Sequence, residues 1–173
     1  MNLLWLIPLL PFAGAAVLGA MGALGNRAPK WLVTLVGLGA PLASLVLALT
    51  CLWQYLGVAP KPFEQVLYAW TTGELNIDFA FLLDPLSAVM LFVVTFIGFW
   101  IHVYSVGYMG HEEGYRRYFA YLNLFMGSML LLILGNNYLV MFMGWEGVGL
   151  CSYLLIGFYY DQEVPPAAGK KAF

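Results

Sequence analysis

One acidic residue stands inside a long apolar run, and it carries the clearest chemical signal in the sequence. Glu146 is the ninth residue of the 23-residue run 138–160. In a helix rising about 1.5 Å per residue, it lies within about 5 Å of the bilayer midplane. An ionised acid at that depth costs about 2.5–3.5 kcal/mol, so we expect the side chain to be turned inward. Burial favours the protonated form, which predicts a proton carrier at Glu146. A glutamate held by one fixed partner is the structural alternative.

Histidine supplies the other candidates for proton chemistry. His102 lies about one turn from the end of the apolar run 85–106, where an imidazole can carry a proton or reach the headgroup region. We therefore keep it as a secondary candidate. His111, Glu112 and Glu113 are adjacent, and three adjacent residues cannot all face one ion from a helix. The sequence predicts a solvated loop there and no metal site.

Small residues near Glu146 predict a close contact with another helix. Gly144, Gly147 and Cys151 are spaced three and four residues apart, which allows a neighbouring backbone to approach. The adjacent Trp145 is large, and we expect it to pack against protein.

The composition excludes a soluble globular domain. Of 173 residues, 62% are hydrophobic and 9% are charged, against about 25% charged residues in ordinary soluble domains. The net charge is −2 with no basic cluster, which argues against nucleic-acid binding. Cys51 and Cys151 both lie in apolar runs without the spacing of a metal or redox pair, and we expect two unpaired core residues.

Five apolar runs are long enough to cross a bilayer as helices, which takes about 17 to 25 residues. They are residues 3–24, 31–57, 85–106, 118–134 and 138–160. The first run could instead be a cleaved signal peptide. Its basic residues, Arg27 and Lys30, follow the apolar stretch rather than precede it, so we expect a retained helix. The predicted fold class is an all-α membrane protein.

Basic residues predict the orientation of the chain, because short cytoplasmic loops retain Lys and Arg. With the N-terminus outside, only Lys61 lies in an outer segment. The inner segments then hold Arg27, Lys30, Arg116, Arg117, Lys170 and Lys171. We therefore expect the N-terminus outside and the C-terminus inside.

The outer segment between the second and third runs predicts strands. Apolar and polar residues alternate over 75–81, and residues 66–70 are rich in strand formers. Residues 71–74 can turn the chain. We expect a β-hairpin within 63–84, lying flat on the outer membrane surface; an irregular loop with interfacial aromatics is the alternative.

Four stretches resemble the large antiporter-like subunit of respiratory complex I, called chain 5 in mitochondria and the L subunit in bacteria. They are LDPLS at 83–87, HVYSVGYM at 102–109, RYFAYLNLF at 117–125 and GWEGVGLCSYLLIGF at 144–158. Residues before Leu83 agree mainly in helix count and hydrophobic pattern.

This resemblance implies a subunit of the proton-pumping NADH:quinone oxidoreductase, at the far end of its membrane arm. It divides the chain into an N-terminal membrane region, 1–117, and the truncated start of an antiporter-like proton-translocating repeat, 118–173. The family's glutamate falls on Glu146, where it works with a lysine on a broken helix and with further residues downstream. We expect this stretch alone not to build a complete proton path.

The resemblance also implies the partners and cofactors. The partners are protons, the lipid bilayer and other membrane-arm subunits. FMN, iron–sulfur clusters and quinone belong to the complex, whereas the chain shows no cysteine cluster or nucleotide motif of its own. We favour a bacterial plasma membrane over a mitochondrial inner or thylakoid membrane. The large subunit of a multi-subunit sodium/proton antiporter, or a packing element with an inert Glu146, are the alternative functions.

Overall fold

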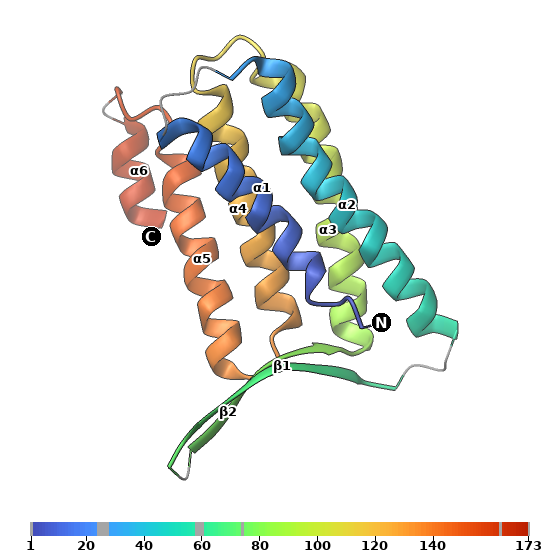
Figure 1. Cartoon of the computed structure of the whole chain (residues 1–173). Helices are drawn as coiled ribbons and strands as arrows, with labels where there is room; N and C mark the ends of the chain where they lie inside the picture. The colour runs from blue at the N-terminus through green and yellow to red at the C-terminus, as the bar shows by residue number, and fades with distance from the viewer. Residues whose placement is uncertain (1, 24–27, 58–60, 74, 163, 173) are drawn as a thin grey trace.

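The computed structural model describes residues 2–23, 28–57, 61–73, 75–162 and 164–172. These residues form a helical bundle with a two-stranded antiparallel hairpin across one end (Figure 1). The elements are α1 (Leu6–Ala23), α2 (Lys30–Gly57), β1 (Phe63–Thr72), β2 (Leu75–Leu83), α3 (Pro85–Tyr108), α4 (Tyr115–Leu134), α5 (Tyr138–Ile156) and α6 (Val164–Ala172).

Among the residues that the structure describes, five helices are long and apolar enough to cross a membrane, and they coincide with the five predicted runs. The predicted helical fold with five candidate membrane helices is therefore confirmed, while several boundaries move. The fourth helix begins at Tyr115 instead of residue 118, and α5 ends at Ile156 instead of residue 160. At this end, the backbone N–H of Gly157 donates back to the Tyr153 carbonyl. The short helix α6 was not predicted, because its nine residues include two lysines and two prolines.

Helix α4 forms the centre of the bundle. The helices α1, α2, α3 and α5 all pack against it, and it is the most buried of the five candidate spans, whereas α5 is the least buried. At its first turn, the Tyr115 hydroxyl lies 2.7 Å from the Thr34 hydroxyl of α2. One turn further on, the ring of Phe119 is fully buried against Gly37.

Two prolines inside helices are matched by side chains from neighbouring helices. Pro41 of α2 has no N–H to donate to the Gly37 carbonyl one turn earlier. That carbonyl instead accepts from Nδ2 of Asn123 on α4, at 3.0 Å. In the same way, Pro11 of α1 cannot donate to the Ile7 carbonyl, which accepts from the hydroxyl of Ser44 on α2 at 2.7 Å. At each proline, the carbonyl that lacks its helical donor is thus hydrogen-bonded to an adjacent helix.

The predicted β-hairpin is confirmed, and the irregular-loop alternative is excluded. Phe63 pairs with Leu83 at one end and Thr72 with Leu75 at the other, with a register shift between Val66 and Tyr68. Gly73 turns the chain at a φ of 62°, which glycine adopts without steric cost. The hairpin crosses beneath the helices and extends beyond the start of α5 (Figure 1).

Polar side chains fasten this hairpin to the α4–α5 connection and to the segment that precedes α1. Asn136 donates to the Glu64 carboxylate, and Asn137 donates to the Asp78 carbonyl of β2. The side chain of Asn137 also accepts from the backbone N–H groups of the first turn of α5 and caps this helix. At the N-terminal end, the Gln65 side chain bonds to backbone atoms of Asn2 and Trp5.

Candidate functional site

Glu146 lies midway along α5, on the exposed side of that helix. The expectation that it is buried is wrong for the part of the chain that the structure describes. The reason is the position of Glu146 around the axis of α5. Gly144, Gly147 and Cys151 all face α4, and at about 100° per residue Glu146 is rotated about 130° away from the centre of that face.

The predicted close contact between helices is confirmed on the face formed by those small residues. A Cβ added at Gly144 would lie 2.5 Å from the backbone nitrogen of Leu132, and one at Gly147 would lie 2.6 Å from the hydroxyl oxygen of Ser128. Cys151 is completely buried on the same side. This packing fixes the rotation of α5 and therefore the direction in which Glu146 points.

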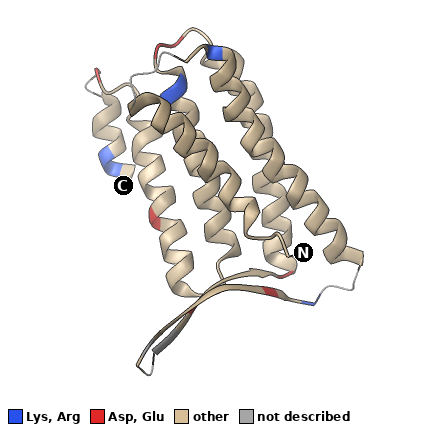
Figure 2. Cartoon of the chain, viewed as in Figure 1, with Lys and Arg blue, Asp and Glu red and all other residues tan. Residues whose placement is uncertain are grey.

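An apolar groove of about 590 Å³ runs beside the Glu146 side chain. It is lined by Tyr138, Leu139, Met141, Phe142, Trp145 and Glu146. Trp145, which we expected to pack against protein, is 66% exposed here. The face thus combines one carboxyl group with large apolar side chains, and in Figure 2 an acidic segment interrupts the otherwise uncharged middle of α5.

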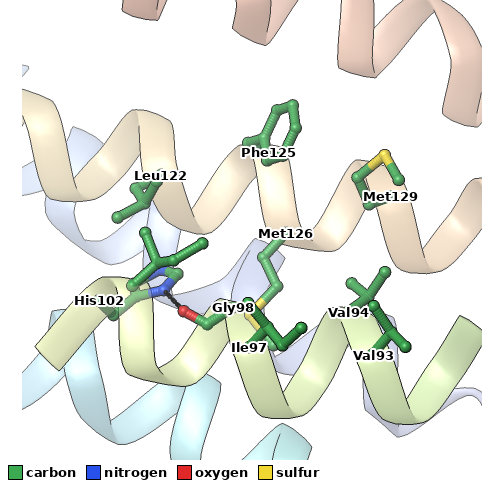
Figure 3. Close-up of a pocket in the computed structure, with 10 residues that line it drawn as sticks. Val93, Val94, Ile97, Gly98, His102, Leu122, Phe125, Met126 and Met129 are labelled. Carbon is green, nitrogen blue, oxygen red and sulfur yellow. Dashed lines mark hydrogen bonds between the residues drawn. The ribbon is translucent and has the colours of Figure 1, made fainter. Parts of the chain in front are cut away.

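His102, the secondary candidate, is buried between α3 and α4, with only 2% of its surface exposed. Its Nδ1 lies 2.7 Å from the Gly98 carbonyl oxygen (Figure 3). Because a carbonyl only accepts, Nδ1 carries the proton in this bond. Among the described residues, Nε2 has no hydrogen-bond partner. Any proton exchange at this ring therefore takes place at Nε2.

A pocket of about 200 Å³ adjoins His102, between α3 and α4. Figure 3 shows Met126 and Met129 of α4 facing Val93, Val94 and Ile97 of α3 across it. The lining is otherwise apolar, so this pocket offers no chain of polar groups to relay a proton onward.

The structure does not bring the two candidates together. His102 packs against Phe119 of α4, with ring centres 6.4 Å apart, whereas Glu146 points away from α4 on the far helix α5. Helix α4 therefore stands between them. In this arrangement a proton cannot pass directly between these two residues.

The remaining candidate groups are separate from this site. His111 and Glu113 are exposed in the turn between α3 and α4. Within the described ranges, no cluster of three or more His, Cys, Asp or Glu side chains is placed to hold a metal ion. Cys51 and Cys151 are free and buried, as expected.

Sequence reasoning missed two polar residues that the structure makes prominent. Asn123 is fully buried and joins α4 to α2, and Arg117 enters a pocket beside the end of α5. A polar residue in the middle of an apolar run was the available signal for Asn123. In the sequence, Arg117 contributes only to the predicted orientation of the chain. No local pattern shows that residues at the end of α5 lie beside it.

Two family models match the chain. The model described as "NADH-Ubiquinone oxidoreductase (complex I), chain 5 N-terminus" matches residues 70–119. The model described as "NADH:quinone oxidoreductase/Mrp antiporter, TM" matches residues 135–173, which include Glu146.

Curated relatives match along the whole chain. Subunit L of the NADH-quinone oxidoreductase of Escherichia coli (strain K12) is 46% identical over 175 residues, covering 100% of this chain and 28% of the relative. Over its whole length the chain is thus similar to subunit L of NADH-quinone oxidoreductase. Subunit L of Neisseria meningitidis serogroup A is 42% identical over 175 residues, covering 100% of the chain and 26% of the relative.

A relative from an organelle-like compartment also belongs to this group. The NAD(P)H-quinone oxidoreductase subunit 5 of the Paulinella chromatophora chromatophore is 41% identical over 181 residues, covering 99% of the chain and 26% of the relative. These matches confirm the resemblance found in the sequence. The chain spans about a quarter of the length of these subunit L relatives.

Proposed function

We propose that this chain takes part in redox-driven proton translocation as part of a membrane-arm subunit of NADH:quinone oxidoreductase, with Glu146 as a proton carrier. The observation that carries the proposal is the position of Glu146. It is the one acidic residue in the helices α1 to α5, it lies midway along α5, and it falls in the segment that matches the antiporter family model.

The exposure of Glu146 supports a role in an assembled complex. An ionised carboxylate facing lipid at this depth costs about 2.5–3.5 kcal/mol or more, so the side chain requires a protein or water-filled environment. The exposed groove beside it, with Phe142 and Trp145 in its wall, is the surface that other protein of the membrane arm would cover. In that environment the carboxyl group binds a proton when its surroundings are negative and releases it when a positive charge approaches.

The charge distribution supports the orientation that we propose. Lys30 begins α2, and Arg116 and Arg117 lie in the first turn of α4, so these three residues are at the end of the bundle opposite the hairpin. Lys61 precedes β1, at the hairpin end (Figure 2). By the positive-inside rule, the hairpin faces outward and the opposite end faces a bacterial cytoplasm. We also propose that residues 118–173 begin the antiporter-like repeat, after the membrane region 1–117.

The decisive experiment compares Glu146→Gln with Glu113→Gln in the assembled complex. Both variants replace one carboxylate by an amide, but Glu113 lies in an exposed turn. We expect both complexes to assemble, and only Glu146→Gln to lower NADH-driven proton pumping severalfold. Glu146→Asp should recover part of the activity, because it keeps a titratable acid. Normal pumping by an assembled Glu146→Gln complex would refute the carrier role and leave Glu146 as an inert packing residue.

A sodium/proton antiporter is the second candidate function, because the family model that contains Glu146 includes Mrp antiporters. The two functions differ in their driving force. Proton movement that depends on a sodium gradient and persists without NADH would favour the antiporter. Copurification with flavin and iron–sulfur subunits would favour the oxidoreductase.

A further inference from the structure

A half-buried arginine at the end of the bundle opposite the hairpin has an unusual setting. Arg117 lies in the first turn of α4, and its Nη2 donates to the Phe158 carbonyl oxygen at 3.0 Å. Its guanidinium carbon lies 4.6 Å from the centre of the Phe158 ring and 4.7 Å from that of Tyr160. The two aromatic rings and the carbonyl hold the guanidinium in one place.

The guanidinium borders a pocket of about 160 Å³ between the start of α4, the end of α5 and the start of α6. Tyrosines 121, 153 and 160 also line it, together with Gly157 and Pro166. The Phe158 ring, which lines the pocket, is closely packed, because a Cβ added at Gly114 would lie 2.6 Å from it. The pocket is therefore many times larger than the roughly 10–15 Å³ that one water molecule requires.

The charge of Arg117 has no carboxylate partner in the described part of the chain. Glu112, Glu113 and Asp161 lie in the neighbouring turns, yet the bond to Phe158 is the hydrogen bond that the structure gives to this guanidinium. A guanidinium carries five N–H donors, and its planar fork suits two oxygens of one phosphate group. The pocket therefore offers a fixed cation with donors to spare.

The position of the pocket at the start of α4 indicates a class of ligand. Arg117 lies at the first turn of a membrane-spanning helix, which places it at the level of lipid headgroups. Basic pockets between membrane helices at this level bind the phosphates of anionic lipids. We propose that the Arg117 pocket binds the phosphate group of an anionic phospholipid. The proposal does not depend on proton exchange at Glu146.

Labelling of the purified complex with a photoreactive phosphatidylglycerol tests this site. In the native complex, we expect crosslinks in the peptide that contains Tyr160, and no competition by phosphatidylcholine. Arg117→Gln should reduce this labelling about tenfold, as expected when a charge-assisted hydrogen bond to an anion is lost. Arg117→Lys keeps the charge but not the fork, and should label at an intermediate level.

The neighbouring arginine provides a matched control. Arg116→Gln removes the same charge one residue away, but the Arg116 side chain packs against Gly22 of α1 and does not line the pocket. We expect its labelling to equal that of the native complex. Equal labelling in Arg117→Gln would show that Arg117 only braces the two helices, and equal loss in Arg116→Gln would show a general charge effect. Displacement of the lipid probe by inorganic phosphate would show that the site binds a free anion. Any of these three results would overturn the proposal. If Arg117→Gln fails to assemble, Arg117→Lys decides between these outcomes.

Discussion

The Asn123 side chain replaces the backbone donor that Pro41 lacks, and we predict that these two residues are energetically coupled. Asn123→Ala leaves the Gly37 carbonyl buried without a donor, which costs about 1–3 kcal/mol in proteins generally. Hydrogen bonds between membrane helices are worth about 0.6 kcal/mol on average and about 1.7 at most. We therefore expect Asn123→Ala to lower the free energy of unfolding by about 1–2 kcal/mol, including the space left by the side chain.

Pro41→Ala should remove much of that sensitivity. It restores a backbone N–H at position 41, which can donate to the Gly37 carbonyl in the ordinary helical pattern. In this background we expect Asn123→Ala to cost about 1 kcal/mol less than in the native sequence. The space left by the shortened side chain is the same in both backgrounds, so its contribution cancels in the double-mutant cycle.

Unfolding of the full-length subunit by sodium dodecyl sulfate measures these free energies in all four variants. Pro11→Ala is the matched control, because the carbonyl beside Pro11 accepts from Ser44 and not from Asn123. Asn123→Ala should cost the same with or without Pro11→Ala. An equal cost of Asn123→Ala in the native and Pro41→Ala backgrounds would refute the idea that the amide substitutes for the missing backbone donor.

Two further substitutions test the helix contact and a helix cap. Gly144→Ala should lower the melting temperature of the subunit, because its Cβ would meet the backbone of Leu132 and overpacking costs about 1–3 kcal/mol, whereas Gly149→Ala, with open space around it, should be neutral. Equal effects would contradict the observed α4–α5 contact. Asp84→Ala should cost about 1 kcal/mol, because the carboxylate caps α3 by accepting from the backbone N–H of Ser87 at 2.7 Å. Hydrogen bonds from the backbone and the side chain of Ser87 lower the pKa of the Asp84 carboxyl group. The contribution of this carboxylate to folding stability is therefore complete above the ordinary aspartate pKa of about 3.9. It is lost as the pH falls through the lower pKa that Asp84 has in the folded protein. Melting temperatures measured down this pH range should fall less in Asp84→Asn than in the native subunit.

Local sequence patterns were sufficient for the membrane helices and the hairpin. Length and apolar content mark a spanning helix, and alternation marks residues 75–81 as a strand, because both signals depend only on neighbours in sequence. The direction of Glu146 could not be obtained by the same route. It depends on which face of α5 packs on α4, and Gly144 and Gly147 define that face.

Contacts between distant segments explain the other differences. Asn123 and Gly37 are 86 residues apart, and Arg117 and Phe158 are 41 residues apart, so no local pattern pairs them. The nine-residue helix α6 has weak helix-forming residues at its start, including Pro165 and Pro166, and depends on packing against α5. Tertiary contacts therefore decide these features.

The bonds that fasten the hairpin set an order of events during synthesis and membrane insertion. Both strands leave the ribosome before α3 and α4 are made, but their partners Asn136 and Asn137 follow α4. Those two asparagines return to the hairpin side only after α3 and α4 have both crossed the bilayer. The bonds of Gln65 to Asn2 and Trp5 can form once β1 is made, whereas those of Asn136 and Asn137 must wait for two more transmembrane crossings. Formation of the asparagine bonds therefore marks the moment at which the first four helices are in place.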